Sequence, residues 1–234
     1  MVIEWLVEAD FAHFSHPATI YSSLTYPVPP KTTVMGMLGA IAGMDDVTPL
    51  NSMRYAVCVE RLDGKRQFCF NGIKEALSVL DPKKWVDPKK PFGVKERKQF
   101  YRELLITPKY RIFCDLSEVS SKESIVEAMQ KGKCHYPLYL GINFCLATYE
   151  LVALHGDNQE RTAEDVEIDS MVPLEYDFVL EPDKQYTDIR MATTVDAQRH
   201  FGGFRDYLVE LGGQKIRCNK AKVCDIGDKT IAWS

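Results

Sequence analysis

The start of the chain alternates between apolar and polar residues. The odd-numbered positions from Ile3 to Phe11 are apolar, whereas Glu4, Glu8 and Asp10 lie between them. A period of two places the apolar side chains on one face of an extended strand. The pattern therefore predicts a half-buried β-strand over the first eleven residues.

A helical pattern follows a pair of prolines. Pro29 and Pro30 exclude a helix before them and suit the first turn of a helix after them. Apolar residues then recur with the spacing i, i+3, i+4 and i+7, which predicts an amphipathic helix that ends near Gly43. The apolar positions of this helix are Val34, Met37, Leu38 and Ile41.

The opposite face of this predicted helix has almost no side chains. Gly36, Gly39, Ala40 and Gly43 repeat on it, although each glycine inside a helix costs about 1 kcal/mol relative to alanine. A bare face lets another backbone approach closely. It predicts either tight packing within the domain or a docking surface for a partner or a phosphodiester backbone, with the helix N-terminus as an anion site.

The rest of the chain gives strand and helix patterns around one irregular segment. Asp63-Gly64 between two strand-like runs predicts a β-hairpin. The sequence DPKKWVDPKKPFG at 81–93 breaks all periodicity and indicates a basic insertion. The predicted elements are strands at 53–62, 67–73, 109–116 and 139–154, a helix at 120–132, strands near 187–195 and 214–233, and a helix at 198–211 that Gly202-Gly203 interrupts.

The order of these elements predicts an α+β fold. A strand, a helix, a hairpin, an insertion, a strand, a helix and a strand correspond to a ferredoxin-like or RRM-like core of the type β-α-β-β-α-β. We expect this domain to span 1–154 with the insertion near 81–108, and a β-rich C-terminal extension at 155–234 to pack on it. The same fold serves RNA-binding proteins and many enzymes, so it does not by itself indicate a function.

The chain has 234 residues and a net charge of −4, but its charges are unevenly distributed. Ten bases and three acids occur from Lys83 to Arg111, and ten acids and two bases occur from His155 to Tyr186. A protein with one basic third can bind RNA locally despite a negative total. An ordinary solvated surface with local charge clusters is the alternative.

The cysteines and the apolar runs indicate the cellular compartment of the protein and whether it binds a cofactor. Seven cysteines without a C-x-x-C pair, several of them in strand-like runs, do not indicate a zinc site or a disulfide framework. No apolar run is long enough to span a bilayer, and the acidic N-terminal segment does not resemble a signal peptide. We therefore expect a cytoplasmic protein with no metal or other cofactor and no membrane contact.

Three segments carry a family resemblance. The N-terminal strand runs into ADFAHFSHP, TYPVPPKTTVMGMLGAIAG follows at 25–43, and YPLYLGINF occupies 136–144. With these segments, the first two-thirds of the chain resembles the Cas-five family of CRISPR-associated proteins, which are RAMP-superfamily subunits of type I Cascade interference complexes. The residues that match the family's helix motif are Tyr26, Pro29, Pro30, Lys31, Thr32, Thr33, Val34, Gly36, Met37 and Leu38, and a Tyr-Leu-Gly element falls on Tyr139, Leu140 and Gly141.

The resemblance implies a RAMP core with a protruding thumb, and the basic insertion would form part of the thumb or lie next to it. It implies that the chain grips the 5′ handle of the guide RNA at one end of the Cascade filament. The implied protein partners are the repeated backbone subunit and the large subunit, and target DNA near the PAM-proximal end is a further partner. The overall pattern is most similar to the type I-B branch, in which a separate endonuclease processes the transcript.

The candidate RNA-binding residues follow from the chemistry of RNA. The ammonium of Lys31, the hydroxyls of Thr32 and Thr33 and the amides of the helix start can hold phosphates, and Gly36 can admit the backbone. Single-stranded RNA is also bound by stacking and by basic side chains, and the candidates of this kind are His13, Tyr26, Lys98, Arg102 and Arg111.

Each of these candidates has a structural alternative. Tyr26 can instead pack on the helix, and Arg102 can pair with a helix acid. The lysines between Lys83 and Lys90 can serve only to keep a loop soluble.

Three hypotheses about function remain. The first is a non-catalytic RNA-binding subunit of a type I Cascade. The second is a metal-independent endoribonuclease that processes precursor guide RNA, as in the type I-C branch, with His13, His16 and Tyr21 or Tyr26 in acid–base roles. The third is an unrelated ferredoxin-like scaffold whose glycine-containing helix serves only for packing.

Overall fold

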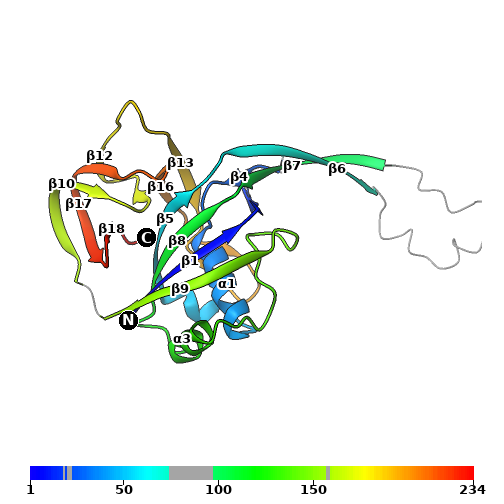
Figure 1. Ribbon diagram of the computed structural model, residues 1–234, viewed down its shortest axis with the longest axis horizontal. Coiled ribbons are helices and arrows are strands. Elements are labelled where there is room, and N and C mark those ends of the chain that lie inside the picture. The colour runs from blue at the N-terminus through cyan, green and yellow to red at the C-terminus, as the bar shows by residue number, and fades with distance from the viewer. Residues whose placement is uncertain (18, 20–22, 74–96, 157–158) are drawn as a thin grey trace, which may run out of the picture.

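The centre of the molecule is a four-stranded antiparallel sheet. The computed structural model describes residues 1–17, 19, 23–73, 97–156 and 159–234. The sheet has the strand order β5-β8-β1-β9, with one α-helix after its first strand along the chain and another after its third (Figure 1). Its strands are β1 (Val2–Ala9), β5 (Arg54–Arg61), β8 (Lys109–Asp115) and β9 (Ala147–His155).

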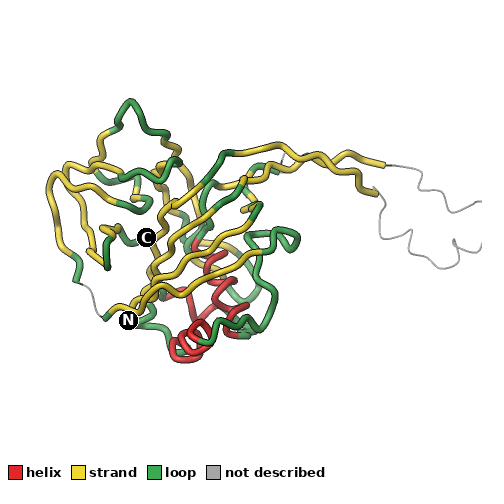
Figure 2. The backbone as a smooth tube through the Cα atoms, in the orientation of Figure 1, coloured by secondary structure: helices red, strands yellow, loops and turns green. Residues whose placement is uncertain are grey.

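Two α-helices pack against one face of this sheet, and the part of the chain that the structure describes contains no others. They are α1 (Lys31–Ala42) and α3 (Lys122–Gln130), shown in red in Figure 2. Trp5 of β1, Leu38 of α1 and Ile125 of α3 are fully buried in one apolar core. The predicted N-terminal strand and the two predicted helices at these positions are confirmed, and the whole fold is mostly β-sheet.

Helix α1 begins and ends where the prolines and the glycine predict. Pro30 is the residue before its first turn, and Gly43 ends it in a left-handed conformation with a φ of 72°. All four apolar positions predicted from the sequence are buried. Its glycine face is partly used for packing within the chain, because a Cβ on Gly39 would lie 2.6 Å from Val47, whereas a Cβ on Gly36 would meet nothing within 4 Å.

A long β-hairpin projects from the sheet, and we call it the thumb hairpin (Figure 1). It consists of β6 (Lys65–Ile73) and β7 (Arg97–Ile106), and β7 also pairs with the short strand β2 (Phe11–Ala12) near the body of the protein. The segment that leaves the sheet therefore begins at Lys65, earlier than the predicted insertion near 81–108. The lysines between Lys83 and Lys90 lie outside the described residues.

The prediction that Asp63-Gly64 forms a tight hairpin between β5 and β6 is wrong. β5 pairs with β8, and β6 pairs with β7. The place beside β5 is covered on both faces, so it requires a strand that is apolar on both sides. β8 meets this requirement with Ile112 and Phe113, which are both fully buried, whereas β6 contains exposed polar residues such as Gln67.

The C-terminal part of the chain consists of short antiparallel strands. β17 pairs with β10, β12 and β18, while β16 pairs with β11 and β13, and β14 pairs with β15. Two further short strands, β3 (Phe14–Ser15) and β4 (Thr25–Tyr26), pair with each other, and a 3-10 helix spans Thr48–Ser52. The C-terminal bounds are β10 Arg161–Ile168, β11 Val172–Pro173, β12 Asp177–Val179, β13 Tyr186–Met191, β14 Thr194–Val195, β15 Phe201–Gly202, β16 Arg205–Glu210, β17 Ile216–Ile226 and β18 Lys229–Ile231.

The predicted C-terminal strands near 187–195 and 214–233 are confirmed, but the predicted helix at 198–211 is wrong. This segment forms β15 and β16, and the four residues from Tyr207 to Glu210 are buried in succession. Strand β16 lies between β11 and β13, so its two edges are hydrogen-bonded. Pairing on both sides and burial on both faces override the helical spacing of the apolar residues.

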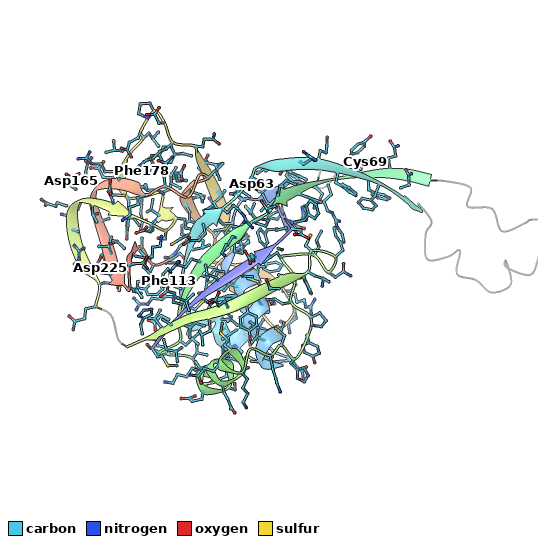
Figure 3. All side chains as sticks on the ribbon, in the orientation of Figure 1. Asp63, Cys69, Phe113, Asp165, Phe178 and Asp225 are labelled. Atoms are coloured by element: carbon cyan, nitrogen blue, oxygen red, sulfur yellow. The ribbon has the colours of Figure 1, made fainter. Side chains whose placement is uncertain are left out.

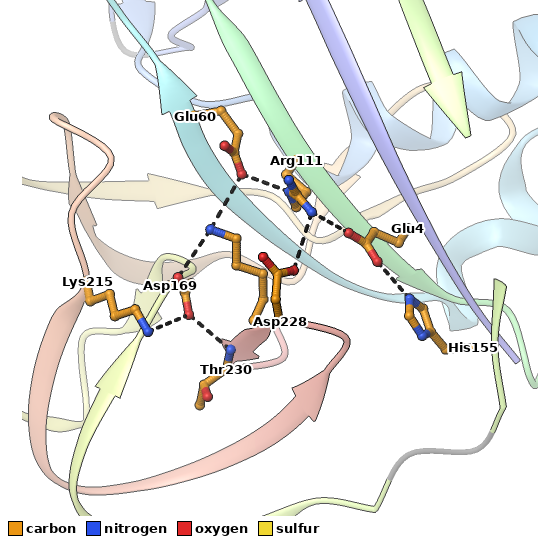
Figure 4. Close-up of polar contacts among 9 residues, drawn as sticks. Glu4, Glu60, Arg111, His155, Asp169, Lys215, Asp228 and Thr230 are labelled. Atoms are coloured by element: carbon orange, nitrogen blue, oxygen red, sulfur yellow. Dashed lines mark hydrogen bonds and ion pairs between the residues drawn. The ribbon is translucent and has the colours of Figure 1, made fainter. Parts of the chain in front are cut away.

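The C-terminal strands cover the face of the central sheet that the helices leave open. Val2 and Phe113 of the sheet form an apolar cluster with Ile226, Ile231 and Trp233. A chain of ion pairs lies beside this cluster (Figure 4). It includes Lys229, which bridges Glu60 of the sheet and Asp169 of the extension at 3.6 Å and 3.3 Å.

Two acids of the stretch at 155–186 lie beside bases of β17. Arg217 pairs with Asp165 at 2.6 Å, and Lys220 lies opposite Glu164 in the strand register. Arg161 pairs with Asp225 at 2.8 Å. The acids therefore form a mixed-charge surface with their neighbours in the sheet.

Candidate nucleic-acid interface

One face of the thumb hairpin is aromatic and basic. The strand register places Phe68 opposite Arg102, Phe70 opposite Phe100, and Arg66 opposite Leu104. Because side chains alternate between the two faces of a strand, these six side chains share one face. We call this set the hairpin face, and it contains no acid. Phe68, Phe70 and Phe100 are 53%, 38% and 37% exposed, although large apolar side chains normally lie in a core.

The aromatic rings of the hairpin face are held in place by their neighbours. Phe70 and Phe100 stack with ring centroids 5.6 Å apart and an angle of 21° between the rings. The ring of Phe100 also covers Gly72, where a Cβ would lie 2.5 Å from the ring. Gly72 thus leaves room for the ring of Phe100 beside the backbone.

Arg102 joins the hairpin face to a loop of the body. Its guanidinium lies 5.9 Å from the ring centroid of Phe70 and 5.9 Å from that of Phe144, within range of a cation–π interaction. Its buried Nε has no hydrogen-bond partner among the described residues. The alternative that Arg102 pairs with an acid is not what the structure shows, since no ion pair of Arg102 occurs within the described part of the chain.

The opposite face of the thumb hairpin is polar. Tyr101 donates a hydrogen bond to Gln99, and the Glu103 carboxylate accepts one from the amide of Thr25 at 3.0 Å. Lys65 pairs with Glu103 at 3.5 Å. The acid Glu103 and the three phenylalanines therefore lie on opposite faces of the same hairpin.

His13 lies at the root of the thumb hairpin and is fully buried. Its Nδ1 lies 2.7 Å from the carbonyl oxygen of Glu103, and its Nε2 lies 3.0 Å from the hydroxyl oxygen of Ser23. A carbonyl can only accept, so Nδ1 carries the proton and Nε2 accepts the Ser23 hydroxyl proton. Burial lowers the pKa of His13, and nearby Arg102 acts in the same direction. His13 is therefore a buried neutral imidazole at this position.

The Tyr-Leu-Gly element packs directly on His13. The amide of His13 donates to the carbonyl of Leu140 at 3.1 Å. A Cβ on Gly141 would lie 1.9 Å from the carbonyl oxygen of His13, and Gly141 has a φ of 86°. Both facts require glycine at this position. The loop that follows carries Phe144, so this packing positions the aromatic partner of Arg102.

A groove of about 490 Å³ lies over the exposed part of the glycine face of α1. Of the predicted RNA-binding residues, Thr32, Thr33 and Gly36 line this groove. Their role in RNA binding stays a prediction. The groove also contains three acids, three exposed aromatic residues and one arginine: Asp45, Asp46, Asp196, Tyr136, Tyr139, Phe201 and Arg199.

Two other predicted site residues make contacts within the chain. The Tyr26 hydroxyl donates to the carbonyl of Arg190 at 2.6 Å, and its ring packs on His16. Lys31 is buried and donates to the carbonyl of Asn51 at 2.8 Å, and burial lowers its pKa to about 8. Each of these contacts gives the residue a structural role, whatever its role in binding.

Arg111 is also held by contacts within the chain. Its guanidinium contacts Glu4 at 2.6 Å, Glu60 at 2.8 Å and Asp228 at 3.6 Å (Figure 4). It therefore connects the central sheet to the C-terminal extension, and its positive charge is matched by acids.

Lys98 and Arg102 are the two predicted residues that belong to the thumb hairpin. Lys98 lies in β7, opposite Gly72. Sequence reasoning missed the aromatic members Phe68, Phe70 and Phe100. The signal was present, because the sequence RQFCF at 66–70 alternates with a period of two and places both phenylalanines on the same side as Arg66.

The described residues offer no metal site, since no group of three or more His, Cys, Asp or Glu side chains among them is placed to hold an ion. Five of the seven cysteines are buried, as expected for small apolar residues. Cys69 lies on the thumb hairpin (Figure 3). Both Cys69 and Cys134, which follows α3, are exposed. No helix among the described residues is long and apolar enough to cross a membrane.

Comparison with solved structures shows that the fold occurs in other CRISPR proteins. A chain of a CRISPR RNA-guided surveillance complex superposes with a TM-score of 0.58 at 14% identity, covering 93% of this chain and 91% of that one. A CRISPR protein from Archaeoglobus fulgidus gives a TM-score of 0.51 at 12% identity, with 99% and 98% covered. A further Cas protein gives a TM-score of 0.50 at 16% identity, with 91% and 96% covered.

The family is identified by a comparison of the sequence with protein-family models. No curated protein sequence matches the chain. A family model described as CRISPR-associated protein (Cas_Cas5) matches residues 2–205, which includes the central sheet, the thumb hairpin and most of the C-terminal strands. This chain therefore belongs to the CRISPR-associated protein (Cas_Cas5) family.

Proposed function

We propose that this chain is a non-catalytic RNA-binding subunit of a type I CRISPR Cascade complex, most like the type I-B branch. In this role it grips the 5′ handle of the guide RNA and caps one end of the backbone-subunit filament, next to the large subunit. Family membership and the fold shared with a chain of an RNA-guided surveillance complex support the role as a subunit. The observation that carries the RNA-binding part is the acid-free aromatic and basic hairpin face.

The proposed mode of binding is stacking combined with contacts to phosphate. Unpaired bases stack on Phe68, Phe70 and Phe100, and such stacking contributes about 1–3 kcal/mol per base. Arg66 and Arg102 of the same face supply positive charge for the backbone. Because stacking tolerates any base, this surface gives affinity for single-stranded RNA rather than a choice of sequence.

The topology supports the ferredoxin-like, RAMP-type assignment of the core. The order β5-β8-β1-β9, with helices after the first and third strands along the chain, is the arrangement of a β-α-β-β-α-β unit. We assign this domain to 1–154, with the thumb hairpin as its excursion, and assign 155–234 to the extension. The apolar cluster between Phe113 and Trp233 supports the packing of the two parts as one body.

The contacts of His13 and Tyr26 favour the non-catalytic proposal over the endoribonuclease alternative. Acid–base cleavage needs a side chain that can exchange a proton with the 2′-hydroxyl of the RNA. Both ring nitrogens of His13 are engaged inside the protein, and the Tyr26 hydroxyl donates to a backbone carbonyl. Tyr21 of the alternative lies outside the described residues.

The experiment that tests the proposal uses the purified chain and a labelled precursor guide transcript in EDTA. Native and denaturing gels are run from the same reactions. We expect a native-gel shift with intact RNA. A shift that needs the backbone and large subunits would agree with a subunit that acts only in the complex.

Two results would overturn the proposal. A discrete cut at the repeat would establish the endoribonuclease alternative. Absence of both shift and cut, with and without the partner subunits, would favour a scaffold that does not bind RNA.

A further inference from the structure

His13 connects three separate segments at the root of the thumb hairpin. Its imidazole bonds to Glu103 of β7 at 2.7 Å and to Ser23 at 3.0 Å, and its backbone amide bonds to Leu140 at 3.1 Å. The Ser23 carbonyl in turn accepts a hydrogen bond from the amide of Glu103 at 2.9 Å. One side chain thus bonds the returning strand of the hairpin, β7, to a segment of the body.

Other contacts beside His13 join the two ends of the hairpin at its root. The amide of Thr107, just after β7, donates to the carbonyl of Asp10 at 2.8 Å, and the Thr107 hydroxyl donates to Asp63. These contacts hold the two ends of the hairpin to each other and to β1. The ring bonds of His13 join β7 to the segment of Ser23, and its backbone amide joins them to the loop that carries Phe144.

We propose that His13 is a positioning residue, which fixes the direction of the thumb hairpin so that the hairpin face meets Phe144 and presents its rings to RNA. This inference rests on the proposed RNA-binding function of that face. The geometry replaces the acid–base role considered for His13 with a structural one. His13 does not touch RNA, but it acts through Glu103 on the strand that carries Phe100 and Arg102.

The chain offers a direct readout of the hairpin direction without new cysteines. Cys69 lies on the thumb hairpin and Cys134 on the body, and both are exposed, whereas the other five cysteines are buried. Spin labels on these two thiols report the distance between hairpin and body by pulsed electron resonance. The full chain is used, with thermal unfolding followed by circular dichroism as a check on folding.

Three variants of His13 separate positioning from general stability. His13→Ala removes both ring bonds, His13→Asn retains a donor for Glu103, and His13→Gln retains a group that reaches Ser23. We expect His13→Ala to broaden or shift the Cys69–Cys134 distance distribution and to weaken RNA binding about tenfold, the effect of losing two ordinary hydrogen bonds. The two conservative variants should lie between it and the native chain. If His13→Ala does not fold, the measurements on His13→Asn and His13→Gln test the proposal.

The matched control is His155→Ala, which removes an imidazole bonded to Glu4 at 2.7 Å, far along the chain from the hairpin root. We expect it to leave the distance distribution and RNA affinity unchanged. The dependence of RNA affinity on salt should also be the same in His13→Ala and in the native chain, because no phosphate contact is lost.

The outcomes separate the positioning role of His13 from the proposed RNA-binding function. An unchanged distance distribution in all three His13 variants overturns the positioning role, whatever the RNA result. A changed distribution with native RNA affinity also overturns it. If the native chain binds no RNA even with its partner subunits, the proposed function fails, while the distance measurement still reports on His13.

Discussion

Two exposed surfaces of this chain carry aromatic side chains, and they differ in charge. The hairpin face combines three phenylalanines with Arg66 and Arg102 and has no acid. The groove over α1 combines Tyr139 and Phe201 with Arg199, but it also contains three aspartates. The first surface is positive and the second is negative, although a list of exposed aromatic residues would not separate them.

The difference indicates which surface suits a polyanion. Binding to phosphates requires bases that neutralise them, and neighbouring carboxylates oppose the same contact. The hairpin face meets this condition, and the groove over the glycine face is the weaker candidate for RNA. The lesson is that stacking surfaces must be judged together with the acids beside them.

The largest expected effect concerns Gly141, which lines the groove and also packs on the root of the hairpin. Its left-handed backbone and the 1.9 Å approach of the His13 carbonyl to a Cβ leave no room for a side chain. We expect Gly141→Ala to lower the free energy of unfolding by about 3 kcal/mol or more. Urea denaturation followed by circular dichroism measures this change.

The matched control for this prediction is Gly132→Ala. Gly132 has a φ of 61°, but a Cβ there meets nothing within 4 Å. Gly132→Ala should therefore lower the free energy of unfolding only by the cost of the left-handed backbone, about 1 kcal/mol. Equal effects of the two substitutions would contradict the packing of Gly141 on His13.

The next largest effect is on RNA affinity, when one aromatic residue is removed from each surface in turn. Phe100→Ala removes a stacking ring from the hairpin face, and we expect RNA affinity to fall about tenfold. Phe201→Ala removes an exposed ring from the groove and should leave RNA affinity unchanged. Fluorescence anisotropy with a labelled single-stranded guide measures both. A larger loss for Phe201→Ala would reverse the ranking of the two surfaces.

The parts of the fold that could be predicted are those with a local signal. The strand at β1 and helix α1 follow from periodicity, prolines and Gly43, which act within a few residues. The pairing of β5 could not be predicted, because Asp63-Gly64 gives a strong local hairpin signal. The partner of β5 is instead chosen by burial on both faces, which depends on C-terminal strands that lie far away in the sequence.

The same distinction applies to the candidate site. Charge clustering led to Lys98 and Arg102, and both lie in the thumb hairpin. Phe144 could not be connected to Arg102 from the sequence, since the contact depends on how the Tyr-Leu-Gly loop packs on His13. His13 was itself predicted as an RNA contact, which stays a prediction, and its burial and its bonds to Glu103 and Ser23 could not be predicted from the sequence.

A smaller effect concerns the salt dependence of RNA binding. Arg102→Gln keeps a polar side chain on the hairpin face and removes one positive charge. We expect the slope of log affinity against log salt to fall by about 0.7, the value for one phosphate contact of a single strand. Arg199→Gln in the groove should leave the slope unchanged. Equal changes in both variants would indicate that the two surfaces act as one site.

The pH dependence of stability follows from the lowered pKa of His13. The unfolded chain takes up a proton near the ordinary pKa of 6.5, whereas burial and Arg102 disfavour the proton in the folded chain, against a smaller opposing effect of Glu103. The free energy of unfolding should therefore be highest above pH 6.5 and fall as the pH drops below it. It should level off below the lowered pKa.

The fall amounts to about 1.4 kcal/mol for each pH unit that separates the two pKa values. Urea titrations between pH 5 and about 7.5 measure it, and the His13→Asn variant, which has no titrating ring, provides the baseline. A native curve parallel to that of the variant would show that His13 titrates normally.

The smallest effect tests the groove by adding a single methyl group. Gly36 lies in α1 with helical geometry, and a Cβ there meets nothing within 4 Å. Gly36→Ala should therefore stabilise the chain by about 0.5–1 kcal/mol, since alanine is the better helix former. If the groove does not hold RNA, RNA affinity stays unchanged as stability rises. A loss of RNA affinity without a loss of stability would place RNA against the glycine face and make charge a poor guide to these two surfaces.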